Sequence, residues 1–294
     1  MRVHILPLII LFISLFSCQS KQQEDKQVST IDSTLQAKAT SILENKLTEL
    51  YALSGQAIVM EVQTGHIKAM VELERKDSAD YQPCENFSQA YESALIQPIS
   101  ILAALETGKI KLTDTVDVGD GIYICKEDTI KDHNWHRGGY GKITIKQGLA
   151  SSSEIAVYKA MEIAFNGYTQ AYYDQLKEIG ISNLDTPLQM LTAYNSIANN
   201  ENNQANIDSL KQALEYVVTD GLGQPAKSNK VEVAGKTGTV QLEDGSYIVE
   251  FCGYFPANAP KYSIIVSIHK EELPASGGLM AGDVFRQIVD YMNE

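Results

Sequence analysis

The sequence of 294 residues predicts an α+β fold, in which helices flank an antiparallel sheet and an α-helical lobe lies beside the sheet. Two mostly apolar segments, 56–62 and 67–71, flank a turn at Thr64-Gly-His66, which predicts a β-hairpin. The apolar alternation over 247–254 and 262–268 predicts two more antiparallel strands. Apolar residues at helical spacing then predict a helix over 281–292 that packs on the sheet.

Helices are predicted for most of the remaining chain. The apolar spacing of residues 31–53 indicates an amphipathic helix that leads into the hairpin. Further helices are expected at 167–180, near Pro187 and at 207–218. These three segments make up most of the predicted α-helical lobe.

The N-terminus has the pattern of an export signal. A cationic start is followed by an apolar run, Ile5–Phe16, which is too short to span a membrane stably. The run ends in Leu15-Phe-Ser-Cys18, which resembles the lipobox of bacterial lipoproteins. That resemblance implies a signal peptide over 1–17 and lipidation of Cys18, whereas an ordinary secretory signal or an anchor helix are the alternatives.

A flexible tether is predicted after the cysteine, over residues 18–30, because residues 19–30 contain a single apolar side chain and cannot bury a core. The remaining residues, 31–294, form one predicted domain. Removal of the signal would leave 23 basic and 37 acidic residues, a net charge of −14. This charge argues against nucleic acid as a partner and against electrostatic docking on anionic lipid.

The run Val233-Ala-Gly-Lys-Thr-Gly-Thr-Val240 is the most informative motif. A strand that carries Lys236, Thr237, Gly238 and Thr239 presents an ammonium and two hydroxyls, and its glycine allows a ligand backbone to approach closely. We expect these four residues to bind a substrate carboxylate. A Lys-Thr-Gly triplet alone also occurs by chance, so the surrounding segments decide its meaning.

Those segments resemble, in family order, the transpeptidase domain of monofunctional, division-type penicillin-binding proteins. The resemblance covers about residues 50–294 and implies the fold shared with serine β-lactamases. It rests on the following segments: 59–70, 86–92, 98–106, 139–150, 187–200 and Gly253-Tyr-Phe-Pro256.

The resemblance fails at the family's nucleophile. Alignment on Pro98 places Ala94 at the nucleophile position and Gln97 at the position of the catalytic lysine. Alanine has no hydroxyl to acylate, and an amide is no base. Ser93 is the fallback nucleophile, but a one-residue shift turns a helical side chain by about 100°. A helix N-cap is the structural alternative for Ser93.

The second family motif, Ser-x-Asn, aligns with Ser152-Ser-Glu154. Ser152 keeps its hydroxyl, whereas an ionised Glu154 only accepts hydrogen bonds and cannot replace the amide donor. Glu154 is also able to pair with Lys236. The alternative is that Glu154 is simply an acid in the first turn of a helix. The resemblance further implies an oxyanion hole from the backbone N–H groups of Ala94 and Thr239, which survive the loss of the serine.

No metal or cofactor is predicted. His133 and His136 lack an evident third ligand, so a surface loop accounts for them better than a metal site. After lipidation three cysteines remain. Cys252 is expected in the core, whereas Cys84 and Cys125 fall in segments predicted as loops, and their pairing stays open.

Three hypotheses for function follow. The first is an inactive pseudoenzyme of the transpeptidase family, which binds a peptidoglycan stem peptide or a partner protein without acylation. The second is an active serine D,D-transpeptidase, D,D-carboxypeptidase or β-lactam-binding relative that uses Ser93 or Ser152. The third is a structural scaffold with a collapsed cleft.

The expected surroundings follow from the same resemblances. The lipid anchor would hold the domain in the bacterial cell envelope, on the periplasmic side or at the outer membrane. Expected ligands are a stem peptide or a non-covalently bound β-lactam. Expected protein partners are those of cell-wall synthesis or division.

Overall fold

The computed structural model describes residues 30–77, 80–84, 93–125, 128–167, 169–181, 184–199 and 204–294. The predicted signal peptide, Cys18 and nearly all of the predicted tether lie outside these residues. Within the described ranges, no helix is both long enough and apolar enough to cross a bilayer.

A six-stranded antiparallel sheet forms the centre of the molecule, in the order β3-β2-β1-β10-β9-β8. The strands are β1 (Ser54–Glu61), β2 (Ile67–Asp77), β3 (Asp80–Pro83), β8 (Ala234–Gln241), β9 (Tyr247–Phe255) and β10 (Tyr262–Lys270). Both predicted strand pairs are confirmed. They join through β1 and β10, so the N-terminal hairpin and the C-terminal strands share one sheet.

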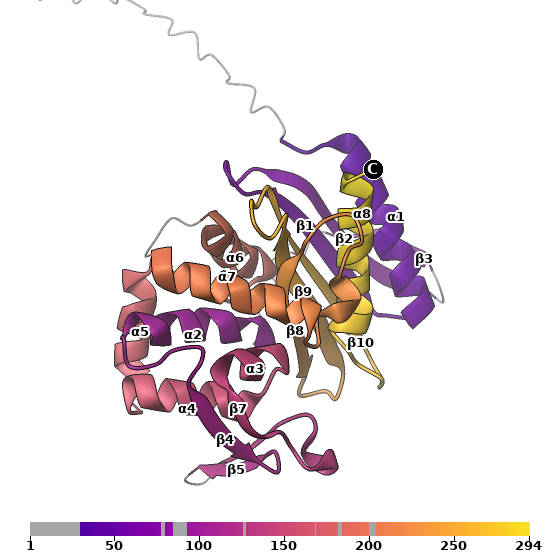
Figure 1. The fold of residues 1–294 in the computed structure, drawn as a ribbon. Coiled ribbons are helices and arrows are strands. Elements are labelled where there is room, and N and C mark those ends of the chain that lie inside the picture. Colours follow the sequence, from indigo (N-terminus) through magenta and orange to yellow (C-terminus); the bar gives the residue numbers. More distant parts are fainter. Residues whose placement is uncertain are drawn as a thin grey trace, which may run out of the picture.

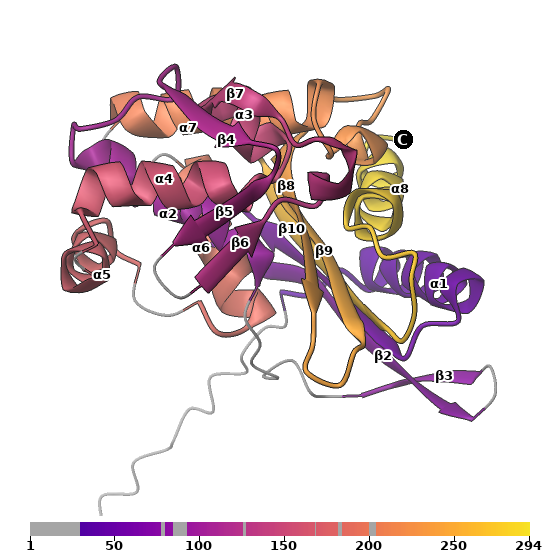
Figure 2. The same cartoon turned by 90° about the horizontal axis from the view of Figure 1, so that it is seen from below.

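Two terminal helices cover one face of this sheet. Figures 1 and 2 show α1 (Ser33–Leu50) and α8 (Asp283–Met292) side by side on it. Asp32 caps α1 by accepting from two backbone N–H groups of the first turn. Phe285 of α8 packs edge-on against Phe251 of β9, with ring centroids 4.7 Å apart. Both predicted terminal helices are therefore confirmed.

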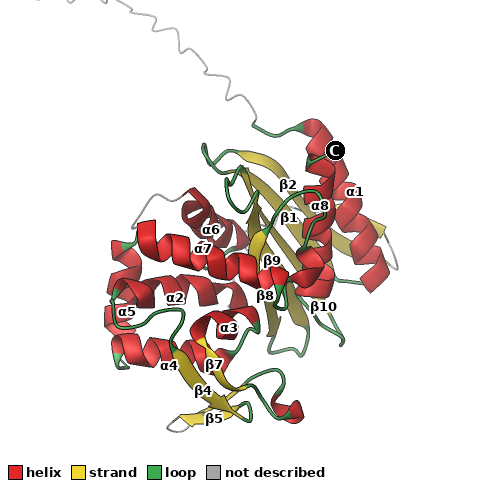
Figure 3. Cartoon of the chain, viewed as in Figure 1, coloured by secondary structure: helices red, strands yellow, loops and turns green. Residues whose placement is uncertain are grey.

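The opposite face of the sheet meets the helical lobe. Figure 3 shows the helices of the lobe gathered together beside the sheet. The lobe contains α2 (Gln97–Glu106), α3 (Ile145–Ala150), α4 (Glu154–Phe165), α5 (Thr169–Glu178), α6 (Pro187–Asn199) and α7 (Gln204–Thr219). The predicted lobe helices correspond to α5, α6 and α7. One buried cluster joins lobe and sheet, and it includes Tyr194 of α6 and Cys252 of β9.

Two small sheets that the sequence did not indicate extend from the lobe. β4 (Thr115–Gly119) pairs with β7 (Gly141–Thr144), and β5 (Ile122–Cys125) pairs with β6 (Asp128–Lys131).

Within the described residues, Cys84, Cys125 and Cys252 are not joined by disulfide bonds. Cys125 ends strand β5 rather than lying in a loop, and its sulfur contacts the hydroxyl of Tyr158. Cys252 is fully buried, as expected.

Candidate active site

Strand β8 is the edge of the central sheet, and it carries the Lys-Thr-Gly motif. Lys236 lies opposite Cys252, and Gly238 lies opposite Glu250 on β9. Residues two apart on a strand share a face, so Lys236 and Gly238 both face the lobe. A Cβ at Gly238 would lie 3.0 Å from the Glu250 carboxylate and 3.4 Å from Leu95. Glycine is therefore required for close packing of three elements at this point.

Lys236 is the buried cation of the site, with none of its surface exposed. Its ammonium donates to the Ser152 hydroxyl and to the carbonyl of Thr237 at 2.9 Å. Burial lowers the pKa of Lys236 to about 8, although the charge of Glu154 acts in the opposite direction. The second-motif serine and the motif lysine are therefore in contact, a pairing that the sequence did not predict.

Ser152 sits in a tight turn between α3 and α4. Its φ of 51° is left-handed, which is uncommon for a residue with a side chain. The Ser152 hydroxyl also lies 3.3 Å from that of Thr237. The turn therefore aims the Ser152 side chain at strand β8.

Asp132 holds this turn in place, a role that was not expected from the sequence. It is fully buried, and it accepts from the hydroxyl of Ser153 at 2.7 Å and from the backbone N–H of Ile155 at 3.1 Å. Ser153 in turn caps α4. Asp132 and Glu154 thus place two carboxylates near the start of α4, where the helix dipole favours negative charge.

Glu154 pairs with Gln97, the residue at the family's lysine position. The Gln97 amide donates to the Glu154 carboxylate at 2.7 Å. Burial of this carboxyl group raises the pKa of Glu154, and Lys236 and the Gln97 bond act against that shift. A direct Glu154–Lys236 ion pair was considered from the sequence. The Glu154 carboxylate instead accepts from Gln97, and the Lys236 ammonium donates to Ser152.

Ser93 caps the short helix Ala94–Ile96, as the structural alternative from the sequence predicted. Its hydroxyl accepts from the backbone N–H of Leu95 at 3.1 Å and donates to Glu250 at 2.6 Å. The short helix is also held from α6, because the buried Tyr194 hydroxyl donates to the carbonyl of Leu95 at 2.9 Å. Ser93 is therefore part of a structural network.

Glu250 is the second buried carboxylate that sequence reasoning missed. None of its surface is exposed, and it also accepts from Ser267 of β10 at 3.1 Å. A glutamate in the middle of the apolar strand 247–254 was the available signal. Lys270, at the end of β10, contacts the carbonyl of Glu272.

Thr239 is the exposed end of the motif. Its hydroxyl donates to the carbonyl of Gly238 at 2.8 Å and accepts from the N–H of Gly277 at 3.1 Å. A ligand that reaches Thr239 would therefore compete with these internal bonds. The short helix of Ala94 packs against β8, so the two backbone segments expected to form the oxyanion hole are neighbours.

The predicted histidine loop lies near the small sheets. His133 and His136 are both exposed, and the His133 Nε2 lies 2.7 Å from the Tyr140 hydroxyl. Burial of the ring nitrogen and the charge of Arg137 lower the pKa of His133. No group of three or more His, Cys, Asp or Glu side chains in the described part of the chain is placed to hold a metal ion.

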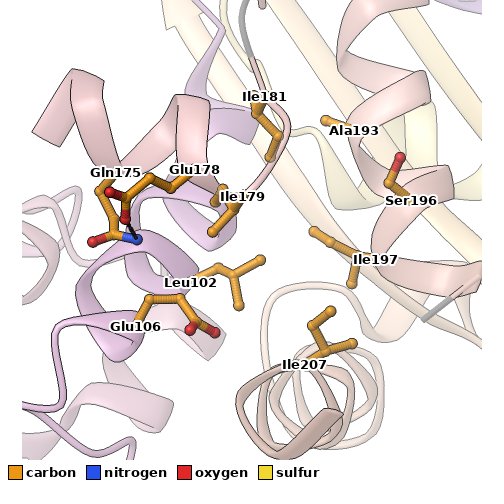
Figure 4. Close-up of a pocket in the computed structure, with 10 residues that line it drawn as sticks. All are labelled: Leu102, Glu106, Gln175, Glu178, Ile179, Ile181, Ala193, Ser196, Ile197 and Ile207. Carbon is orange, nitrogen blue, oxygen red and sulfur yellow. Dashed lines mark hydrogen bonds between the residues drawn. The ribbon is translucent and has the colours of Figure 1, made fainter. Parts of the chain in front are cut away.

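A cavity of about 260 Å³ lies inside the helical lobe, away from the motif residues (Figure 4). Its wall combines apolar side chains, such as Leu102, Ile197 and Ile207, with polar and charged ones. Its carboxylates already accept hydrogen bonds: Glu178 from Gln175 at 3.1 Å, and Glu106 from the Asn206 amide at 3.1 Å. None of the predicted site residues lines it.

Known proteins resemble this chain over nearly its whole length. The chain is 24% identical to the probable peptidoglycan D,D-transpeptidase PbpC of Pseudomonas aeruginosa over 331 aligned residues, which cover 92% of this chain and 58% of PbpC. It thus spans less than two thirds of that relative.

Solved structures share the fold at 20% identity. The transpeptidase domain of FtsI4 from Legionella pneumophila superimposes with a TM-score of 0.69, over 90% of this chain and 98% of that one. The transpeptidase domain of penicillin-binding protein 3 from Burkholderia pseudomallei gives 0.73, over 90% and 95%.

The family model for the penicillin binding protein transpeptidase domain matches residues 55–185 and 164–290. These segments include both strands of the motif hairpin, the turn of Ser152 and the helix that follows Ser93. The chain belongs to the penicillin binding protein transpeptidase domain family.

Proposed function

We propose that this protein is a catalytically inactive member of its family, which binds a peptidoglycan stem peptide or a partner protein without acylation. The observation that carries the proposal is the Gln97–Glu154 hydrogen bond of 2.7 Å. Gln97 stands at the position that aligns with the family's catalytic lysine, and its amide is no base. Ala94, at the position that aligns with the nucleophile, has no hydroxyl to deprotonate.

The opposite side of the site supports ligand binding. Lys236 and Ser152 remain in contact, and Thr239 remains exposed at the end of strand β8. The packing of the Ala94 helix against β8 keeps two backbone segments where family members bind an oxyanion. Weak recognition of a peptide carboxylate is compatible with this arrangement, whereas acylation at Ala94 is not.

The proposed setting is the bacterial cell envelope. The curated relative PbpC is named a probable peptidoglycan D,D-transpeptidase, which supports a role linked to peptidoglycan synthesis for this chain. Lipidation at Cys18 would tether the domain to the periplasmic side of a membrane or to the outer membrane. A protein of cell-wall synthesis or division is the proposed partner, and a β-lactam is proposed to bind only non-covalently.

Calorimetric titration with N-acetyl-D-alanyl-D-alanine tests the binding role. We expect weak, saturable binding by the purified full-length protein and a loss of at least about tenfold in affinity for Lys236→Met, since a charged donor is removed. Lys230→Met, on an exposed loop, is the matched control and should bind as the parent does. Absence of binding to the folded parent would favour the scaffold hypothesis.

One observation favours the active alternative. The Ser152 hydroxyl contacts the buried Lys236, whose pKa of about 8 would let it accept a proton near neutral pH, and Ser152 has left-handed backbone geometry. A serine enzyme that uses Ser152 would form a covalent adduct with benzylpenicillin at that residue. Ser93 is less suited, because its hydroxyl already caps a helix and binds Glu250.

A further inference from the structure

The hydrogen-bonding capacity of the site is unequal on its two sides. On the β8 side, Lys236, Ser152 and Thr237 supply an ammonium and two hydroxyls. On the α2 side, the side-chain donor to Glu154 among the described residues is the Gln97 amide, and it is already used. The α2 side therefore has hydrogen-bond acceptors but few unused donors.

One of these acceptors lacks a partner. Gln97 is 3% exposed, and none of the described residues donates to its Oε1. Rotation of the Gln97 amide by 180° would not give this oxygen a donor, because it would then face the Glu154 carboxylate, which only accepts when ionised. A buried carbonyl without a donor is costly, so this oxygen favours a bound group that carries N–H or O–H.

The local charge points to the sign of that group. Asp132 and Glu154 supply two carboxylates near the start of α4, and Lys236 supplies one ammonium. Asp132 is satisfied by Ser153 and Ile155, whereas Glu154 has one side-chain donor, Gln97. Glu154 is exposed to solvent along part of its side chain, so a ligand can reach it.

We propose that Glu154 and the Gln97 carbonyl bind a primary ammonium group, in a peptide whose terminal carboxylate is held on the β8 side. An ammonium has three N–H donors and no acceptor, which matches a carboxylate and a free carbonyl side by side. The preferred ligand class is thus a peptide with both a free amine and a free carboxylate. This inference deepens the proposed binding function and rests on it.

The raised pKa of Glu154 and the lowered pKa of Lys236 agree with a site that is short of counter-charge on both sides. A ligand with opposite charges at its two ends would supply both. Binding of an ammonium beside Glu154 would also lower the pKa of this carboxyl, because a nearby positive charge stabilises its ionised form.

Two dipeptides that differ only in the amine test the proposal. The dissociation constants of D-alanyl-D-alanine and N-acetyl-D-alanyl-D-alanine are measured calorimetrically at pH 7 for the full-length parent, Glu154→Gln and Glu162→Gln. Glu162 lies on the same helix and is exposed, so its variant carries the same charge change outside the site. Circular dichroism confirms that each variant is folded.

The expected result is a preference of about tenfold or more for the free amine in the parent and in Glu162→Gln, and no preference in Glu154→Gln. Equal binding of both dipeptides by the parent would overturn the inference and leave the proposed function standing. A preference that persists in Glu154→Gln would also overturn it. If neither dipeptide binds, the proposed function fails and the inference fails with it.

Discussion

The two sides of the site have diverged to different degrees. On the β8 side, Lys236, Gly238 and Ser152 have the contacts that the motif requires, down to a glycine that packs against Glu250 and Leu95. On the α2 side, the short helix packs against β8, but it begins with Ala94, and α2 begins with Gln97. The β8 side thus keeps the contacts of the family motif, whereas the positions that align with the family's nucleophile and lysine hold other residues on the α2 side.

Hydrogen bonds from buried and half-buried side chains order the α2 side. Ser93 connects to Glu250 and Tyr194 connects to the carbonyl of Leu95, so the short helix is fixed from both the sheet and α6. The predictions below remove these connections and those of the β8 side in turn.

Replacement of Glu250 with alanine should have the largest effect. The change leaves a void and removes the acceptor of Ser93 and Ser267, so we expect the free energy of unfolding to fall by about 3 kcal/mol. Denaturation with urea measures it. Glu250→Gln, which keeps the shape and one acceptor, should lose less. A Glu250→Ala variant as stable as the parent would show that this network does not join the two sides.

The lowered pKa of Lys236 predicts a pH dependence of stability. The unfolded state, with a pKa near 10.5, binds more protons than the folded state between pH 8 and 10.5, so stability due to this group rises with pH across that window. Relative to Lys236→Met, the free energy of unfolding of the parent should rise by up to about 3 kcal/mol across this window. Urea denaturation of both proteins at pH 7.5 and 10 measures the difference. A constant difference would contradict the lowered pKa.

Replacement of Tyr194 with phenylalanine removes one buried hydroxyl that donates to the Leu95 carbonyl. An unsatisfied carbonyl beside the short helix should cost about 1.5 kcal/mol of unfolding free energy. The matched control is Tyr173→Phe, at a residue that is 53% exposed, for which no change is expected. Equal stability of the two variants would place the support of the short helix elsewhere.

Replacement of Ser93 with alanine should have the smallest effect. The loss of an N-cap costs about 1 kcal/mol, and Glu250 keeps its bond from Ser267. Ser209→Ala, on the exposed side of α7, controls for a general loss of a hydroxyl. Thermal denaturation compares the two. A stable Ser93→Ala variant would argue against the structural role of this serine.

The sequence was sufficient for elements with a strong period. Two apolar segments around a turn predicted β1 and β2, alternation predicted β9 and β10, and the apolar spacing of 281–292 predicted α8. The strands of the small sheets are only four or five residues long, too short for a period to emerge.

The site was predictable where a motif names its residues, as at Lys236 and Ser152. It was not predictable where partners are far apart in the chain. Ser93 and Glu250 are 157 residues apart, and Gln97 and Glu154 are 57 apart. Each pair depends on how helix and sheet pack, so a residue's partner could not be deduced from its neighbours in sequence.

Mass spectrometry of the intact, full-length protein after incubation with excess benzylpenicillin tests the central claim, that the site no longer acylates. An active penicillin-binding protein treated alongside shows that the reagent is competent, and circular dichroism shows that this protein is folded. The account predicts an unchanged mass. A stoichiometric adduct, mapped by peptide analysis to Ser152 or Ser93, would contradict it and identify a serine enzyme with a relocated nucleophile.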